Sequence, residues 1–233
     1  MKKKISAVLS AIMMISFLPS AVLAAGNTIS SAQDLQSFRD SVNNGNTYKG
    51  QTVTLSSQLD LSSISWTAIG TEEHPFMGTF DGGGNKITGL TMSCADKYAG
   101  LFGYSGGTIK NLGVASSDSG IKQKYVSEDG VSRDKQRTFA AAVCAYNDGS
   151  IENCTAEGVL SSQNGYAFTA AGGIAGENDG TISGCTNKAR ISANCSGDAG
   201  NFIADAYAGG VCGINEGIIT SSRSEANGLE ETD

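Results

Sequence analysis

Three acidic residues stand at equivalent positions of a repeated sequence, each directly after an asparagine and directly before a glycine. They are Asp148, Asp179 and Glu216. If successive copies of the repeat stack, the carboxylates lie on one flank, where they could bind Ca²⁺ or serve polysaccharide cleavage. Glycoside hydrolysis needs two carboxylates about 5 to 10 Å apart. The simpler interpretation is that the three acids form turns and point into water, since Asp before Gly is ordinary turn chemistry.

The chain has a single histidine, His74, and this limits the catalytic schemes that it can hold. Zinc peptidases of the His-Glu-x-x-His kind need two histidines four residues apart. Ser-His-Asp and Cys-His schemes would have to use His74, which lies in a polar stretch directly before Pro75 and is predicted to form a solvated turn. We therefore expect no catalytic constellation and no cofactor.

Aromatic residues are the other candidates for chemistry. Tyr104 and Tyr146 share one column of the repeat, beside the turn. Two stacked tyrosines could form a platform for a sugar ring, or they could pack against each other and stabilise the turn. Trp66 is the only tryptophan, and we expect it to fill the first stacked unit rather than to bind a ligand.

A slightly basic excursion interrupts the repeats between residues 116 and 137. Its binding candidates are Tyr125, Arg133 and Lys135. An amphipathic tyrosine beside cations suits an acidic sugar or a protein partner, and binding residues often lie on loops of a rigid scaffold. The alternative is a solvated hairpin without a partner.

The six cysteines fall into columns of the repeat. They are Cys94, Cys144, Cys154, Cys185, Cys195 and Cys212. No Cys-x-x-Cys pair is present, which argues against zinc. Cys154 and Cys185 occupy one column in neighbouring copies, and adjacent parallel strands allow either a disulfide between them or a ladder of buried thiols. Cys144 and Cys212 share another column but are separated by Ala175, about 10 Å apart, so they cannot bond.

The repeat itself occurs four times, at offsets of 42, 31 and 37 residues. One apolar column reads Leu101, Val143, Ile174, Val211, and a second, eight residues later, reads Ile109, Ile151, Ile182, Ile219. Between them lies a turn such as Asn147-Asp148-Gly149, where Asn and Gly are expected to supply positive φ values. Each copy is therefore predicted to be strand, tight turn, strand.

These units are predicted to stack on one another. A plain hairpin is the alternative that the turn alone allows. However, units that bury only one or two aliphatic side chains cannot form a core singly and must stack on their neighbours. We therefore predict a β-solenoid, in which Asn147, Asn178 and Asn215 form a ladder of side-chain amides.

The N-terminal residues 1–24 are typical of a secretory signal peptide, with three lysines, an apolar stretch and small residues before Ala25. An uncleaved anchor is the alternative. Cleavage lowers the formal charge from −7 to −10, because Lys2, Lys3 and Lys4 are lost. We expect a secreted or surface protein that binds no nucleic acid and, after cleavage, inserts into no membrane.

Residues 25–97 are predicted to form a lead-in to the repeats of residues 98–233. A helix should begin at Ser31, with Asp34 completing a capping box, and end at Gly45. Its apolar face, Leu35, Phe38 and Val42, should cover the open end of the solenoid. Short strands are expected at 52–55, 58–61, 76–80 and 86–92. The end of the chain, residues 227–233, resembles no cap for the last unit, whose strand edges would be exposed. Either the acidic tail protects this edge by its charge or, as we expect, the chain is the N-terminal part of a longer surface protein.

The copies resemble the GLUG repeat of bacterial surface proteins, which is named for a Gly-Leu-aliphatic-Gly core. The matching segments are Gly100-Leu101-Phe102-Gly103, Gly173-Ile174-Ala175-Gly176 and Gly210-Val211-Cys212-Gly213, while the second copy departs from the pattern with Ala142-Val143-Cys144-Ala145. The resemblance spans roughly Ile29 to Arg223. It implies an all-β fold, a right-handed parallel β-helix on a bacterial surface, of the kind present in adhesin-like proteins and in large IgA-cleaving metallopeptidases.

The sequence therefore predicts a secreted or surface-displayed binding module, adhesin-like, for a glycan or an extracellular protein. Two alternatives remain: a polysaccharide lyase or hydrolase that uses the acids of the turn column, and a purely structural stalk.

Overall fold

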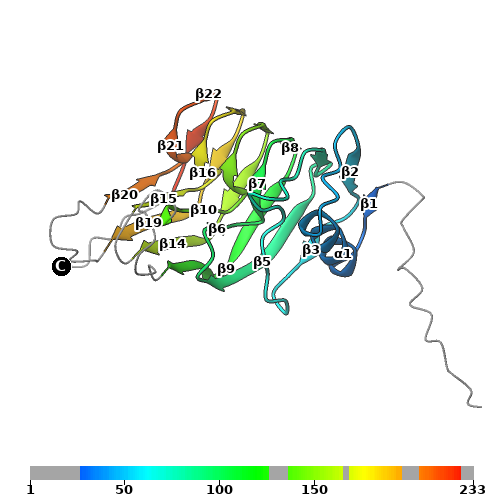
Figure 1. Ribbon diagram of the computed structural model, residues 1–233, viewed down its shortest axis with the longest axis horizontal. Coiled ribbons are helices and arrows are strands. Elements are labelled where there is room, and N and C mark those ends of the chain that lie inside the picture. Colours follow the sequence, from blue (N-terminus) through cyan, green and yellow to red (C-terminus); the bar gives the residue numbers. More distant parts are fainter. Residues whose placement is uncertain (1–26, 126–135, 165–167, 196–204, 227–233) are drawn as a thin grey trace, which may run out of the picture.

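The computed structural model describes residues 27–125, 136–164, 168–195 and 205–226, so the predicted signal peptide lies outside it. These residues form an all-β protein with one helix (Figure 1). The strands make four sheets. The first sheet contains, in spatial order, β1 (Thr28–Ile29), β2 (Thr52–Leu55), β4 (Thr79–Asp81), β8 (Thr108–Lys110), β12 (Ser150–Glu152), β17 (Thr181–Ser183) and β22 (Ile218–Thr220).

The other three sheets run alongside the first. The second contains β6 (Tyr98–Ala99), β10 (Thr138–Ala141), β15 (Phe168–Gly172) and β20 (Asp205–Gly209). The third contains β7 (Phe102–Ser105), β11 (Cys144–Asn147), β16 (Ala175–Asn178) and β21 (Cys212–Asn215). The fourth contains β3 (Leu59–Asp60), β5 (Lys86–Cys94), β9 (Gly113–Tyr125), β13 (Thr155–Glu157), β14 (Val159–Asn164), β18 (Thr186–Asn187), β19 (Arg190–Cys195) and β23 (Arg223–Ser224).

Each copy of the repeat contributes one strand to each of the first three sheets and one or two strands to the fourth, and all pairing between copies is parallel. The copies therefore lie side by side from green to red in Figure 1. Ile151 pairs with Ile109 on one side and with Ile182 on the other, as the columns predicted. The hairpin alternative is wrong, because β11 and β12 pair with neighbouring copies rather than with each other.

The predicted ladder of amides is present inside the stack. Asn147 donates from Nδ2 to Oδ1 of Asn178 at 2.6 Å, and Asn178 donates in the same way to Asn215 at 2.7 Å. Asn147 and Asn178 are fully buried. The ladder therefore gives hydrogen-bond partners to buried amide groups, whose burial without partners would be unfavourable. It also fixes the register of neighbouring copies.

The glycines of the turn have a different role from the one predicted. Gly149, Gly180 and Gly217 do not adopt positive φ values. A Cβ atom on Gly180 would instead lie 2.0 Å from the carbonyl oxygen of Gly149 in the preceding copy. These positions exclude side chains because stacked turns approach too closely. The left-handed residues come after the second strand, at Asn111 and Asn153 among others.

One helix, α1 (Ala32–Asn43), covers the first end of the stack (Figure 1). It begins with the predicted capping box of Ser31 and Asp34. It ends in a Schellman motif, since the N–H of Gly45 donates to Val42 and the N–H of Asn46 donates to the carbonyl of Ser41. The buried face, Leu35, Phe38 and Val42, is the predicted one.

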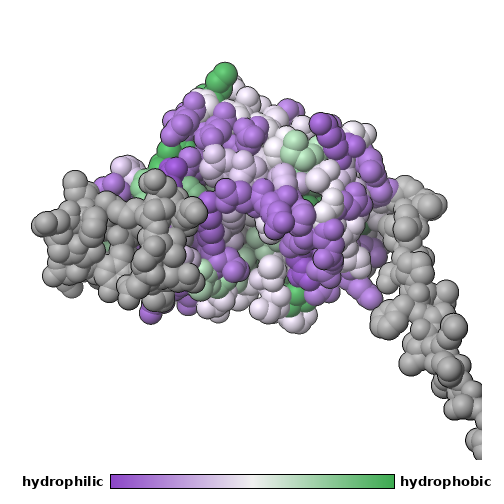
Figure 2. Space-filling view, in the orientation of Figure 1, coloured by the Kyte–Doolittle hydropathy of each residue, from purple (hydrophilic) through white to green (hydrophobic). Residues whose placement is uncertain are grey.

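The core inside the sheets is continuous from the lead-in to the third copy. It contains Trp66, which is 3% exposed and donates from its indole N–H to the carbonyl of Leu101 at 3.2 Å. In the fourth copy the equivalent positions, Val211 and Ile219, are only partly buried. The face seen in Figure 2 is mainly hydrophilic, with hydrophobic residues in small groups.

Candidate binding site at the tyrosine corner

The second and third sheets meet at a corner whose outer side is lined by aromatic rings. Only two residues separate β6 from β7, and alternation turns Ala99 inward and Tyr98 outward. A Cβ atom on Gly103 would lie 2.5 Å from the carbonyl oxygen of Gly70 and 3.4 Å from the Cβ of Tyr98. Glycine in this column therefore lets the outer sides of the two strands approach closely. We name this surface, formed by Tyr98, Tyr104 and Tyr146, the tyrosine corner.

The rings of the tyrosine corner pack in an ordered way. Tyr104 and Tyr146 pair in register on neighbouring strands, and their rings stack with centroids 4.6 Å apart at 20°. Tyr98 meets both rings edge-on, at 5.9 and 6.2 Å, and stacks on Phe139 at 5.8 Å. The predicted column is confirmed. Since the two tyrosines cover each other's inner faces, only their edges and outer faces remain for a ligand.

A second hydrophobic cluster, separate from the main core, lies under these rings. Phe139, Ala145 and Ala170 are buried in it, and Tyr98, Tyr146, Phe168 and Ile214 pack around them partly exposed. A parallel stack already buries its apolar side chains on the inside. An additional apolar cluster on the outside is therefore a surface feature that the stacking of copies does not require.

Ion pairs surround the corner. Lys97 pairs with Glu72 at 2.8 Å and lies over the ring of Tyr98, 5.0 Å from its centroid. Arg137 pairs with Glu177 at 2.8 Å and lies over the rings of Phe139 and Phe168. Both cations are thus engaged by a carboxylate and by aromatic faces at once.

Burial changes the acidity of the corner's groups. The side chain of Glu177 is 3% exposed, and desolvation raises its pKa although Arg137 favours the charged form. Burial and the neighbouring carboxylate of Glu72 raise the pKa of Tyr98. Burial and the hydrogen bond to Asp179 raise the pKa of Tyr146. The phenols therefore stay neutral, which suits hydrogen bonding rather than nucleophilic attack.

The three acids of the turn column do not form the calcium site considered from the sequence. Asp148, Asp179 and Glu216 are exposed, one copy apart, and Asp179 accepts a hydrogen bond from the hydroxyl of Tyr146. In the described part of the chain, no group of three or more His, Cys, Asp or Glu residues could hold a metal ion. The structure therefore gives no support to the calcium hypothesis: the three residues are exposed, and Asp179 is hydrogen-bonded to Tyr146.

Among the described residues of the basic excursion, Arg137 reaches the tyrosine corner through its ion pair with Glu177, but the binding candidate Tyr125 does not. Tyr125 is the last residue of β9 and pairs with Asn164 in the fourth sheet. Arg133 and Lys135 lie outside the described residues. His74 closes a turn in which the N–H of Thr71 donates to the carbonyl of His74, as expected for this segment.

The cysteine columns are as predicted. Cys154 and Cys185 are buried one copy apart, and the N–H of Cys154 donates to the sulfur of Cys185 at 3.4 Å. Both are free thiols in this structure, and the disulfide between them stays a prediction. Ala175 lies between Cys144 and Cys212 in the third sheet.

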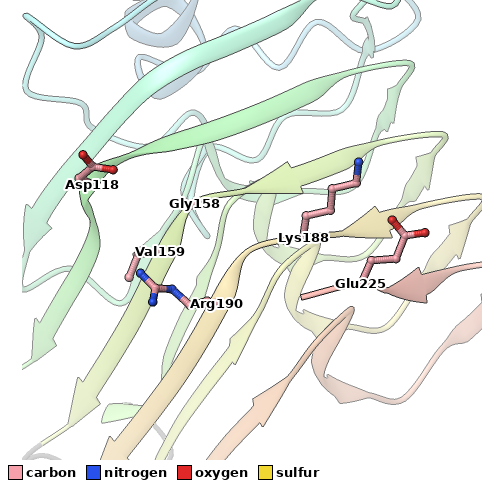
Figure 3. A pocket seen from close by; sticks show the side chains of 6 residues that line it. All are labelled: Asp118, Gly158, Val159, Lys188, Arg190 and Glu225. Atoms are coloured by element: carbon pink, nitrogen blue, oxygen red, sulfur yellow. The ribbon is translucent and has the colours of Figure 1, made fainter. Parts of the chain in front are cut away.

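A shallow groove lies on the fourth sheet, away from the tyrosine corner. It is lined by Asp118, Gly158, Val159, Lys188, Arg190 and Glu225 (Figure 3). Figure 3 shows Asp118 and Glu225 at opposite ends, with Lys188 and Arg190 between them. Glu225 contacts Arg223, which lowers the pKa of this carboxyl. A general acid needs a raised pKa instead.

Several residues of the corner were not found from the sequence. Tyr98 and Phe139 share a register position, but they precede the aligned columns of the repeat. Glu177 stands in the column of Tyr104 and Tyr146, so the alignment contained its signal. Arg137 belongs to the excursion, and nothing in the sequence placed it against Glu177.

Comparisons with known proteins leave the function open. No family model matches the chain, and no curated protein matches its sequence. A crystal structure described as "a putative immunoglobulin A1 protease from Bacteroides ovatus" is similar with a TM-score of 0.46 and 18% identity, covering 90% of this chain and 82% of that one. A likeness this distant carries no argument about activity. Among the described residues, no helix is long and apolar enough to cross a membrane.

Proposed function

We propose that this chain is a secreted or cell-surface binding module, adhesin-like, that recognises a glycan or an extracellular protein at the tyrosine corner. In this proposal the four sheets form a right-handed parallel β-helix displayed on a bacterium, and the protein is not an enzyme. The parallel columns, the resemblance to GLUG repeats and the signal-like N-terminus support it.

One observation carries the proposal: the partly exposed aromatic cluster on the outer side of the stack. A structural stalk needs only inner columns, and its flanks would be featureless. Rings with hydroxyl groups, bordered by charged side chains, are typical of binding surfaces, because they combine apolar area with hydrogen bonding at a low cost in conformational entropy.

A panel experiment tests this function. The chain from residue 25 onward is incubated with bacterial, plant and mucin glycans and with matrix proteins, and both retained protein and released sugar are measured. We expect retention without release. Retention should fall at least tenfold in the double variant Tyr104→Leu, Tyr146→Leu and persist in the control Lys188→Ala, Arg190→Ala, with circular dichroism confirming that both variants fold.

A polysaccharide lyase or hydrolase is the second candidate, because the groove of Figure 3 brings two carboxylates and two cations to one surface. It ranks second since Glu225 has a lowered pKa and Asp118 is exposed, which gives neither carboxyl the environment of a proton donor. Release of sugar that disappears in Asp118→Asn would establish this candidate and overturn the binding module.

A further inference from the structure

The lysine and arginine side chains of the described residues fall into two groups. One group lies in ion pairs, as Lys97 does with Glu72 and Lys86 with Glu157. The members of the other group form no ion pair with any described residue, and they are Lys49, Lys122, Lys124, Lys188 and Arg190. All of these except Lys49 lie in the fourth sheet or in the link between two of its strands. The unpaired positive charge of an acidic chain is therefore gathered on one sheet.

Strand register brings these cations to the outer side of the fourth sheet. Alternation along β9 exposes Lys122 and Lys124 and buries Gln123 between them. Arg190 is exposed at the start of β19, and Lys188 is exposed two residues earlier. Since β14 lies between β9 and β19, these two strands are two strand spacings apart, about 10 Å. We name this surface, formed by Lys122, Lys124, Lys188 and Arg190, the basic face.

Few carboxylates oppose the basic face. The acids at its border that already pair with a cation are Glu157 and Glu225. Asp118 lines the groove of Figure 3 with two cations of the face, and it is exposed. The basic face therefore has a local excess of positive charge, whereas the whole chain has a formal charge of −7. Such a field attracts anionic ligands.

Hydroxyl and amide side chains lie between the cations. The two outer columns of this part of the sheet read Lys122, Ser161, Ser192 and Lys124, Gln163, Asn194. These side chains are exposed or half-buried and recur at the strand spacing of about 4.8 Å. Neither column contains an aromatic or an aliphatic residue. The surface thus offers charge and hydrogen bonds but no apolar centre of the kind that protein interfaces have.

We propose that the basic face is a second binding site, separate from the tyrosine corner, and that it binds an anionic polysaccharide. Carboxylate or sulfate groups of the ligand contact Lys122, Arg190 and the cations beside them, and sugar hydroxyls bond to the serine and amide side chains between. An acidic protein fits less well because the face has no apolar centre, and a single-stranded nucleic acid fits less well because the two columns offer no ring on which a base could stack. The groove beside Arg190, with a volume of about 660 Å³, is shallow and open, which suits an extended chain. The inference extends the expectation of an acidic ligand from the excursion to a face to which several copies contribute.

The test uses the chain from residue 25 onward and four fluorescent probes: an oligogalacturonate, a dextran sulfate oligomer, neutral dextran and a polyglutamate peptide. Fluorescence anisotropy gives the dissociation constant of each at low and at physiological salt. We expect an anionic saccharide to bind at least tenfold more tightly than neutral dextran, and salt to weaken its binding severalfold. The tighter of the two anionic saccharides identifies the group that is bound. Tighter binding of polyglutamate than of both would overturn the polysaccharide ligand.

Single variants locate the site. Lys122→Gln and Arg190→Gln should each weaken binding of the anionic saccharide about fivefold, with an unchanged melting temperature, because both side chains are exposed and form no ion pair with a described residue. Lys49→Gln makes the same change of charge in the lead-in and should leave the dissociation constant unchanged. Equal losses in Lys49→Gln and Lys122→Gln would overturn the basic face as the site.

Two double variants separate this site from the tyrosine corner. Lys188→Ala, Arg190→Ala should lose the anionic saccharide and keep the ligand of the tyrosine corner. Tyr104→Leu, Tyr146→Leu should do the reverse. Loss of the anionic saccharide in the tyrosine variant alone would place that ligand at the corner and overturn the second site. If no anionic probe binds while panel ligands are still retained, the basic face is overturned and the tyrosine corner stands.

Discussion

The two sides of strand β11 (Cys144–Asn147) differ in how their residue types change from one copy of the repeat to the next. On the inner side, Asn147 continues a column in which three copies carry the same residue and bond to one another. On the outer side, Tyr146 belongs to a column that reads Tyr104, Tyr146, Glu177, Ile214. The inner columns of Asn147 and of Ile151 repeat because each copy must fit the same space under its neighbour. Outer positions differ between copies, and we infer that they are where a binding surface forms.

The largest expected effect is the loss of stability caused by a cavity in an inner column, and it tests the difference between the two sides. Ile182 is fully buried between Ile151 and Ile219. Ile182→Ala should lower the free energy of unfolding by about 2 to 5 kcal/mol, because it removes apolar contacts and leaves a void. Urea unfolding followed by circular dichroism measures the change.

The matched control is Ile218→Ala in the last copy, where the side chain is 60% exposed. It should change the free energy of unfolding by less than about 0.5 kcal/mol. Similar losses in Ile182→Ala and Ile218→Ala would contradict the division into inner and outer sides.

The next effect concerns the amide ladder. Asn178 accepts from Asn147 and donates to Asn215 and to the carbonyl of Gly180, so Asn178→Ala breaks three hydrogen bonds and leaves a buried donor of Asn147 less well satisfied. We expect a loss of about 1 to 3 kcal/mol in the free energy of unfolding. Asn215→Ala breaks one of these bonds at an exposed position and should cost less. An equal cost of the two variants would refute cooperative stacking through the ladder.

The sequence predicts the inner side of the strands better than the outer side. The inner columns, the ladder and the capping box of α1 were predictable, because repeated residue types at fixed offsets report a shared environment. The turn was placed correctly, but the reason for Gly180 was wrong, since close approach between copies depends on stacking distance rather than on local φ.

The outer corner was only partly predictable. The stacked pair Tyr104 and Tyr146 followed from one column. The contribution of Tyr98 depends on the bend between the second and third sheets, which brings two strands of one copy together. Arg137 and Glu177 lie 40 residues apart, and their ion pair is set by packing that no local pattern encodes. The acids of the turn column suggested a metal because the sequence gives their spacing and not the direction of their side chains.

The smallest expected effect is the pH dependence of stability that arises where Asp81 of the lead-in contacts the first copy of the repeat. Asn111 donates to Asp81 at 3.0 Å, the N–H of Gly83 donates to it at 2.9 Å, and Lys110 lies nearby, which together lower the pKa of Asp81 below its ordinary value of 3.8. The unfolded chain therefore binds this proton more readily than the folded chain. The stabilisation is present above about pH 4 and is lost as the pH falls through the lowered pKa.

Urea unfolding at pH 6 and at pH 3 measures this contribution. The wild type should lose about 0.5 to 1 kcal/mol more stability on acidification than Asp81→Asn, which keeps an acceptor but cannot titrate there. An identical acid sensitivity of the two proteins would show that Asp81 does not link the lead-in to the repeats. Glu177 acts in the opposite direction, since its raised pKa makes the folded chain relatively less stable as the pH rises.

The most direct test of the account is a paired measurement on two variants of neighbouring strands. Asn178→Ala on the inner side and Tyr146→Leu on the outer side are compared for the free energy of unfolding and for retention on the panel of glycans and matrix proteins. We expect Asn178→Ala to lose stability and to keep its retention on the panel, while Tyr146→Leu loses less stability, through its ring contacts with Tyr104, and loses retention. Loss of both properties in both variants, or of neither in Tyr146→Leu, would contradict it.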